Sequence, residues 1–98
     1  MSLTLLIASD NAALRQELAE RLASDNRHIL SEENGAFVMA RLEREKVDCL
    51  IADLLMPEMD GLALCSRIKS SDSLSHIPVV LFSDVLTRRA DQDLALAA

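Results

Sequence analysis

The sequence predicts an α/β fold, a parallel sheet with helices on both faces, and two observations carry the prediction. Short apolar runs of strand length alternate along the 98 residues with longer segments that have helical periodicity. This alternation is typical of successive βα units, in which the strands run parallel. Polar residues, several of them acidic, follow three of the apolar runs. Right-handed crossovers then leave few orders for the strands.

The first half of the chain supplies two strand–helix units. The continuous apolar run Leu3–Ala8 fits a strand that is covered on both faces. Asn11 is a candidate N-cap for the helix that follows, and one face of that helix carries Leu14, Leu18 and Leu22. Residues 28–31 form a weak strand near a sheet edge, and Gly35 marks a turn. A second helix runs to about residue 46, and its inner face carries Phe37, Val38 and Leu42.

The second half repeats the pattern. Residues 47–52 form the next strand, and a loop with Pro57 follows. Asp60 is an N-cap for a helix that runs to about residue 70, with an inner face of Leu64, Cys65 and Ile68. The apolar run Val79–Phe82 is the fourth strand, and a final helix runs from Thr87 to the end of the chain.

Composition narrows the class of protein to one small domain, residues 1–98. The net charge is −6 and is evenly spread, because residues 1–49 hold six basic and nine acidic residues and residues 50–98 hold four and seven. An acidic chain without a basic cluster, and with two phenylalanines as its only aromatic residues, is not expected to bind nucleic acid. The apolar runs are too short to cross a membrane, and the start lacks the basic residues of a signal peptide. We therefore expect a cytoplasmic protein.

The cysteines and histidines do not form a metal pattern. Cys49 and Cys65 match no zinc spacing, so we expect two buried, reduced thiols. His28 and His76 are far apart in the sequence and are expected to be ordinary surface residues.

Polar side chains at the strand ends indicate a site. Asp10 follows the first strand, Asp53 ends the third, and Ser83 and Asp84 follow the fourth. A single aspartate at a strand end more often begins a turn than it serves a function. In a parallel sheet, however, all these ends meet at one edge, where open α/β sheets bind ligands.

Two neighbouring carboxylates need a counter-charge. At about 4 Å they repel by roughly 4 kcal/mol at an effective dielectric constant near 20. Mg²⁺ suits such a site, because it binds through one or two carboxylates and keeps several waters. A metal, a hydroxyl and an attacking carboxylate suffice for phosphoryl transfer. Asp53 would be the nucleophile and Ser83 would donate to the phosphoryl group.

The same residues resemble a known family, the receiver domains of two-component response regulators. The resemblance covers the whole chain, from LLIASDN through LIADLLMPEMDGLALCSRIK to IPVVLFSD, and DLLMPEMDG at 53–61 is its most specific part. It implies a flavodoxin-like doubly wound parallel sheet with the strand order 2-1-3-4. It also implies that a histidine kinase or a phosphotransfer protein is the partner.

The resemblance assigns roles to particular residues. Asp53 would accept the phosphoryl group and bind Mg²⁺, together with Asp10 and the backbone carbonyl of Leu55. Ser83 would be the hydroxyl that senses the phosphoryl group. Pro57 and Gly61 would shape the loop and the start of the following helix.

Three departures from the family pattern bear on activity. Ser9 stands where the family usually has a second acid, which should weaken Mg²⁺ binding. Asp84 stands where a small residue is usual and could repel a phosphoryl group. The fifth strand and helix of the family are missing, and no residue of this chain matches the phosphate-contacting lysine. The ending ALALAA has no cap, so we expect the native protein to continue beyond Ala98.

Other functions remain open. A pseudo-receiver would have the same fold and act as a phosphorylation-independent protein-interaction module. A phosphatase is disfavoured, because it would need an acid at the position of Leu55, and no glycine-rich nucleotide motif occurs. The resemblance also allows a homodimer through the face of the fourth helix and strand.

Overall fold

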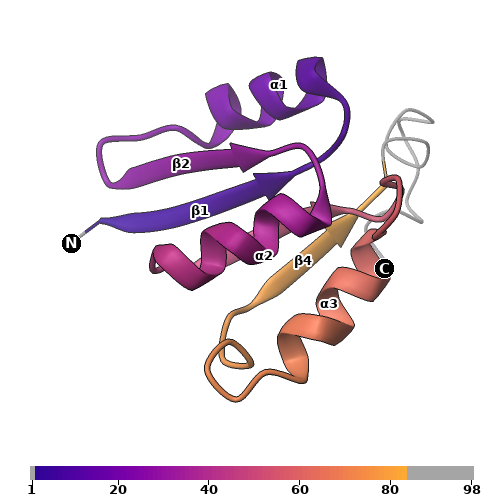
Figure 1. Cartoon of the computed structure of the whole chain (residues 1–98). Coiled ribbons are helices and arrows are strands. Elements are labelled where there is room, and N and C mark those ends of the chain that lie inside the picture. Colours follow the sequence, from indigo (N-terminus) through magenta and orange to yellow (C-terminus); the bar gives the residue numbers. More distant parts are fainter. Residues whose placement is uncertain (1, 84–98) are drawn as a thin grey trace.

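A four-stranded parallel sheet forms the centre of the computed structural model, which describes residues 2–83 (Figure 1). Three helices connect its strands. The elements are β1 (Leu3–Ala8), α1 (Ala12–Leu22), β2 (Arg27–Glu32), α2 (Gly35–Arg44), β3 (Cys49–Asp53), α3 (Gly61–Lys69) and β4 (Val79–Phe82). The predicted α/β fold is confirmed.

The strand order is β2-β1-β3-β4, with every pair parallel. This is the order that the family resemblance implies, and β2 lies at an edge as expected. Ala8 pairs with Ala52 and Asp53 pairs with Phe82, so the carboxyl ends of β1, β3 and β4 lie at one level. The polar residues that end these strands are therefore neighbours.

Helices α2 and α3 cover one face of the sheet and α1 lies over the other (Figure 1). The strand order explains the two layers. The connection from β1 to β2 runs in one direction across the sheet and the connection from β2 to β3 runs in the opposite direction, so right-handed crossovers place their helices on opposite faces. The main core lies under α2 and α3 and is fully or almost fully buried. Its residues include Leu6, Leu50, Val38, Leu42, Leu64 and Ile68. Each contributes roughly 1.5–3 kcal/mol by leaving water.

The helices begin at side-chain caps. Asn11 Oδ1 accepts from the backbone N–H of Leu14 at 3.1 Å, and Asp60 Oδ1 accepts from that of Ala63 at 2.8 Å. Both caps are the predicted ones. Asn34 caps α2 in the same way and was not predicted. Each cap satisfies a donor that the helix itself leaves unpaired.

Several local predictions were wrong. Gly35 does not mark a turn but is the first residue of α2, and Phe37 does not face inward, since it is 48% exposed. Cys49 and Cys65 are free thiols, as predicted, but both are only half-buried. The strand predicted over 47–52 occupies Cys49–Asp53.

The predictions for the histidines, for membrane-spanning helices and for the end of the chain have the following outcomes. His28 and His76 are exposed, as expected. None of the helices in residues 2–83 combines the length and the apolar character that a bilayer crossing requires. Asp84 and the helix predicted from Thr87 lie outside the described residues.

Candidate functional site at the carboxyl edge of the sheet

Three polar residues are buried in the described part of the chain, and all three lie at the carboxyl edge of the sheet. Ser9 follows β1 and is fully buried, Asp53 ends β3 and is 4% exposed, and Ser83 follows β4 and is 9% exposed. Burial of polar groups is costly unless they are hydrogen-bonded. Within the described residues, the carboxyl edge of the sheet is therefore where the buried polar side chains are concentrated.

Both oxygens of the Asp53 carboxylate accept hydrogen bonds. The Ser9 hydroxyl lies 3.0 Å from Oδ2, and the backbone N–H of Leu55 donates to Oδ1 at 3.0 Å. The first contact joins the ends of neighbouring strands β1 and β3, and the second closes a tight turn after β3. The carboxylate is therefore held in one orientation.

The loop after β3 folds back against the strand. The N–H of Leu54 donates to the carbonyl of Phe82 at 2.7 Å, and the N–H of Gly61 donates to the carbonyl of Leu54 at 3.2 Å. Between them the N–H of Met59 donates to the carbonyl of Pro57 at 2.7 Å, and Glu58 has a φ of 67°. These bonds place the start of α3 beside Asp53, which is the shaping role expected of Pro57 and Gly61.

The turn after β1 supports Ser9. The N–H of Asn11 donates to the Ser9 hydroxyl at 3.1 Å, and Nη1 of Arg15 donates to the Ser9 carbonyl. Asp10 lies between these residues in the sequence and is exposed. Sequence reasoning missed the contribution of Arg15, although its place one turn inside α1 could have suggested a contact with the loop before the helix.

Gly35 has a packing role that sequence reasoning also missed. A Cβ atom at this position would stand 2.8 Å from Sδ and 2.9 Å from Cβ of Met59. The start of α2 therefore approaches the loop that follows Asp53 more closely than a larger residue would permit. The signal in the sequence was Asn34, an N-cap residue type that directly precedes an apolar helical pattern.

The residues at this edge include the kinds of oxygen donor that Mg²⁺ prefers. Asp10 and Asp53 offer two carboxylates at the ends of β1 and β3, and Leu55 offers a backbone carbonyl in the adjoining turn. Within residues 2–83 no group of three or more His, Cys, Asp and Glu side chains lies close enough to hold a metal. Mg²⁺ needs only one or two carboxylates, because it keeps several of its waters. An ion with few protein ligands is therefore compatible with this donor set.

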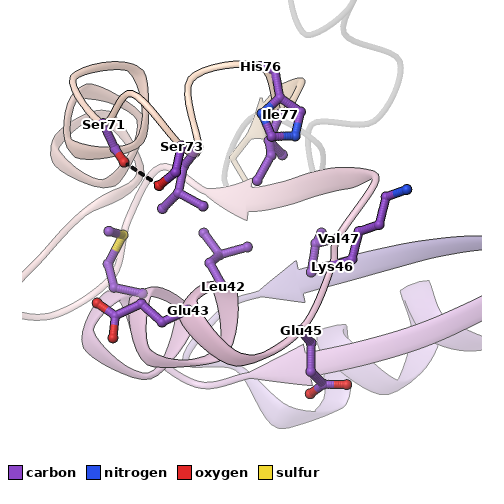
Figure 2. Close-up of a pocket in the computed structure, with 11 residues that line it drawn as sticks. Leu42, Glu43, Glu45, Lys46, Val47, Ser71, Ser73, His76 and Ile77 are labelled. Atoms are coloured by element: carbon purple, nitrogen blue, oxygen red, sulfur yellow. Dashed lines mark hydrogen bonds between the residues drawn. The ribbon is translucent and has the colours of Figure 1, made fainter.

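A separate cleft of about 450 Å³ lies away from this edge, between the end of α2 and the loop that precedes β4 (Figure 2). Its buried floor is apolar, with Leu42, Val47 and Ile77, and its rim carries Glu43, Lys46 and His76. None of the predicted site residues lines it. The candidate site and this cleft are thus distinct features.

Comparison with known proteins agrees with the fold. The sequence pattern of the family described as "Response regulator receiver domain" matches residues 5–98. Histidine kinase P4 of Formosa agariphila is 40% identical over 80 residues, which cover 82% of this chain and 6% of that protein. Response regulator PleD of Caulobacter vibrioides is 30% identical over 92 residues, which cover 94% of this chain and 20% of that protein.

A solved structure shows the same architecture. The signal receiver domain of a signal transduction histidine kinase from Syntrophus aciditrophicus matches with a TM-score of 0.79 and 32% identity, over 95% of this chain and 71% of that one. The fold is therefore a flavodoxin-like doubly wound sheet of the two-component signalling class. The chain belongs to the response regulator receiver domain family. It spans a small part of the length of the two curated relatives.

Proposed function

We propose that this receiver domain accepts a phosphoryl group on Asp53 from a histidine kinase or a phosphotransfer protein. The observation that carries the proposal is the carboxylate of Asp53, which is 4% exposed and is held by hydrogen bonds at both oxygens at the edge where β1, β3 and β4 end. A nucleophile fixed in this way loses little freedom on reaching the transition state. Ser9 and Ser83 supply the other buried polar groups of this edge.

The transfer would proceed by in-line displacement. An oxygen of Asp53 forms a bond to phosphorus while the bond between phosphorus and the donor histidine nitrogen breaks. The electron pair of the broken bond stays with the imidazole nitrogen, which takes up a proton from water. Mg²⁺, held by Asp10, Asp53 and the carbonyl of Leu55, would neutralise charge on the phosphoryl oxygens.

The hydroxyl of Ser83 would then bind the phosphoryl group. Ser83 directly follows Phe82, which pairs with Asp53 in the sheet, so it enters the same edge from the next strand. Movement of Ser83 would carry the change in charge into the segment that follows β4, as switches of this kind require. That segment, the modulating Asp84 and the dimer face of the fourth helix all include residues outside the described part, and these expectations stay predictions.

A pseudo-receiver is the second candidate, and one observation favours it. Ser9 takes the place of an acid and binds Asp53 through its hydroxyl, so the described residues offer two carboxylates to a metal and not three. If the remaining ligands hold Mg²⁺ too weakly, the domain would act as an interaction surface without phosphorylation. The same experiment distinguishes the two functions.

The test is phosphorylation with a small donor. The purified protein is incubated with Mg²⁺ and acetyl phosphate, and its intact mass is measured; one phosphoryl adduct is expected. Asp53→Asn should abolish the adduct. Asp48→Asn is a matched control, because Asp48 accepts a backbone hydrogen bond from Thr4 in the sheet and should leave the adduct intact.

Two results would contradict the proposal. A wild-type protein that forms no adduct at saturating Mg²⁺ and donor would favour the pseudo-receiver. An adduct that persists in Asp53→Asn would mean that another residue is the acceptor.

A further inference from the structure

We propose that Ser9 is a positioning residue whose hydroxyl orients the carboxylate of Asp53 and joins it to the first turn of α1. Its functional meaning rests on the proposed role of Asp53 as acceptor, while the contact itself is a feature of the fold. Ser9 is fully buried, and its Oγ lies 3.0 Å from Asp53 Oδ2. The contact thus lies largely out of reach of solvent.

The direction of this hydrogen bond follows from the inventory of donors. A serine hydroxyl has one proton and two lone pairs, whereas an ionised carboxylate can only accept. The N–H of Asn11 already donates to the Ser9 hydroxyl at 3.1 Å. The single proton of Ser9 is therefore directed to Asp53, in a charge-assisted bond of the stronger kind.

The two hydrogen bonds of Asp53 together fix the plane of its carboxylate. Ser9 holds Oδ2 and the N–H of Leu55 holds Oδ1. Loss of either partner would release rotation about the side-chain bonds. The orientation of the nucleophile is thus set by protein groups alone, before any cation or phosphoryl donor binds.

An acidic residue could not do this. A second ionised carboxylate at position 9 would repel Asp53 and would have no proton to share. Compared with an acid at position 9, serine lacks the negative charge that would attract a cation. It provides instead a hydrogen-bond donor that holds the carboxylate of Asp53. In this chain Ser9 accordingly orients Asp53 without adding a ligand for the cation.

The link to α1 runs through the same side chain. The carbonyl of Ser9 accepts from the Arg15 guanidinium, and Asn11, which donates to the Ser9 hydroxyl, also caps the helix. A displacement of Asp53 Oδ2 would therefore move the Ser9 side chain and, through it, the first residues of α1. The first helix is thus mechanically joined to the acceptor carboxylate.

The first test needs neither Mg²⁺ nor a phosphoryl donor. In Ser9→Ala the carboxylate loses one of its two anchors, so the amide resonance of Leu55 should shift and its hydrogen exchange should accelerate by about tenfold. Leu55 is distant from Ser9 in the sequence and contacts the other carboxylate oxygen, so a purely local role of Ser9 would not move it. Ser9→Thr, which keeps the hydroxyl, should retain the wild-type Leu55 signal.

Ser31→Ala is the matched control. Ser31 is an exposed serine in β2, and its removal should leave Leu55 unchanged. A cooperative thermal transition in each variant establishes that it is folded. An unchanged Leu55 amide in folded Ser9→Ala would overturn the proposal, and an equal disturbance in Ser9→Thr would assign the effect to packing and would also overturn it.

The second test separates positioning from metal binding. At saturating Mg²⁺, the rate constant for adduct formation should fall about tenfold in Ser9→Ala. The Mg²⁺ concentration for half-maximal rate should change by less than about twofold, because no charge has been removed. A wild-type protein that forms no adduct would contradict the proposed function alone, since the Leu55 measurement would still decide whether Ser9 positions Asp53.

Discussion

Gly61 lies so close to Asp53 that a Cβ atom on it would stand 2.5 Å from the Asp53 carbonyl oxygen. The obstructing atom belongs to the backbone of a central strand, which cannot move aside as a side chain can. The N–H of Gly61 also donates to the carbonyl of Leu54. The start of α3 and the end of β3 are therefore fitted to each other at the candidate site.

Gly61→Ala should destabilise the protein by about 2 kcal/mol, because overpacking against backbone forces the helix away from the strand. Helix propensity alone would favour alanine by about 1 kcal/mol, so the sign of the change decides which effect dominates. The measurement is the free energy of unfolding from urea titration. A Gly61→Ala protein as stable as the wild type would contradict the close approach.

Gly35→Ala is the comparison. Its Cβ would stand 2.8 Å from Sδ and 2.9 Å from Cβ of Met59. The sulfur lies in a flexible side chain, whereas the Cβ can give way only if the loop that carries Met59 shifts. The loss of stability should be smaller, about 1 kcal/mol. Equal losses in the two variants would mean that Met59 is held as firmly as the backbone.

Glu32→Gln should lower the free energy of unfolding by about 1 kcal/mol. Arg41 donates to Glu32 from Nε at 2.7 Å and pairs with it through Nη2, and its Nη1 lies 2.7 Å from Glu45. The hydrogen bonds to Glu45 and then Glu32 raise the pKa of Arg41 above its ordinary value. Because the side chains of Glu32 and Arg41 are partly buried, solvent screens this link between α2 and β2 less than it screens a fully exposed pair.

Glu17→Gln provides the control for that prediction. Glu17 and Arg21 form an ion pair within α1 at 3.2 Å, and both side chains are exposed. Such pairs contribute about 0.3 kcal/mol. If the two variants lost the same stability, the link between α2 and β2 would be no stronger than a surface pair.

Cys49 should react slowly with iodoacetamide in the folded protein. Burial raises the pKa of the Cys49 thiol, so less of the reactive thiolate is present at neutral pH. The alkylation rate of Cys49, followed by peptide mass mapping, should reach half its maximum at a higher pH than in the urea-unfolded chain. Equal midpoints in the two states would contradict the prediction.

The same shift has a consequence for stability, with a definite sign. Since the folded-state pKa of Cys49 lies above the unfolded value, the protonated thiol contributes stability below the unfolded pKa. That contribution is lost as the pH rises through the folded-state pKa. Cys49→Ala should therefore show a smaller loss of stability at alkaline pH than the wild type.

Strands with a continuous apolar run and helices with a clear N-cap residue could be predicted from the sequence. The buried face of a helix could not be predicted where the first residue of the helix was uncertain. Apolar runs predicted β1 and β4, and Asn11 and Asp60 predicted two helix starts. Phe37 was predicted to share the inner face with Val38, but successive helical residues differ by about 100° in direction. Once α2 begins at Gly35, Val38 and Leu42 define the buried stripe, and Phe37 points to solvent.

The candidate site was partly predictable for a related reason. Strand ends in a parallel sheet converge by topology, so the alternation of elements predicted that the strand ends carrying Asp10, Asp53 and Ser83 share one edge. It did not predict that Ser9 is the buried residue in contact with Asp53 while Asp10 is exposed. The bond between Ser9 and Asp53 depends on side-chain rotamers, which no residue pattern encodes. The close approaches of Gly35 and Gly61 depend on distances between backbones, and these too appear only in the folded chain.

The hydrogen bond between Ser9 and Asp53 joins residues 44 positions apart in the sequence. Closing so long a segment costs chain entropy before the contact returns any free energy, and parallel pairing of this kind makes folding slow. The Asp53 carboxylate therefore gains its orientation only when β1 and β3 are side by side. No excised peptide containing DLLMPEMDG would reproduce this orientation, so assembly of the sheet and alignment of the proposed acceptor are one cooperative event.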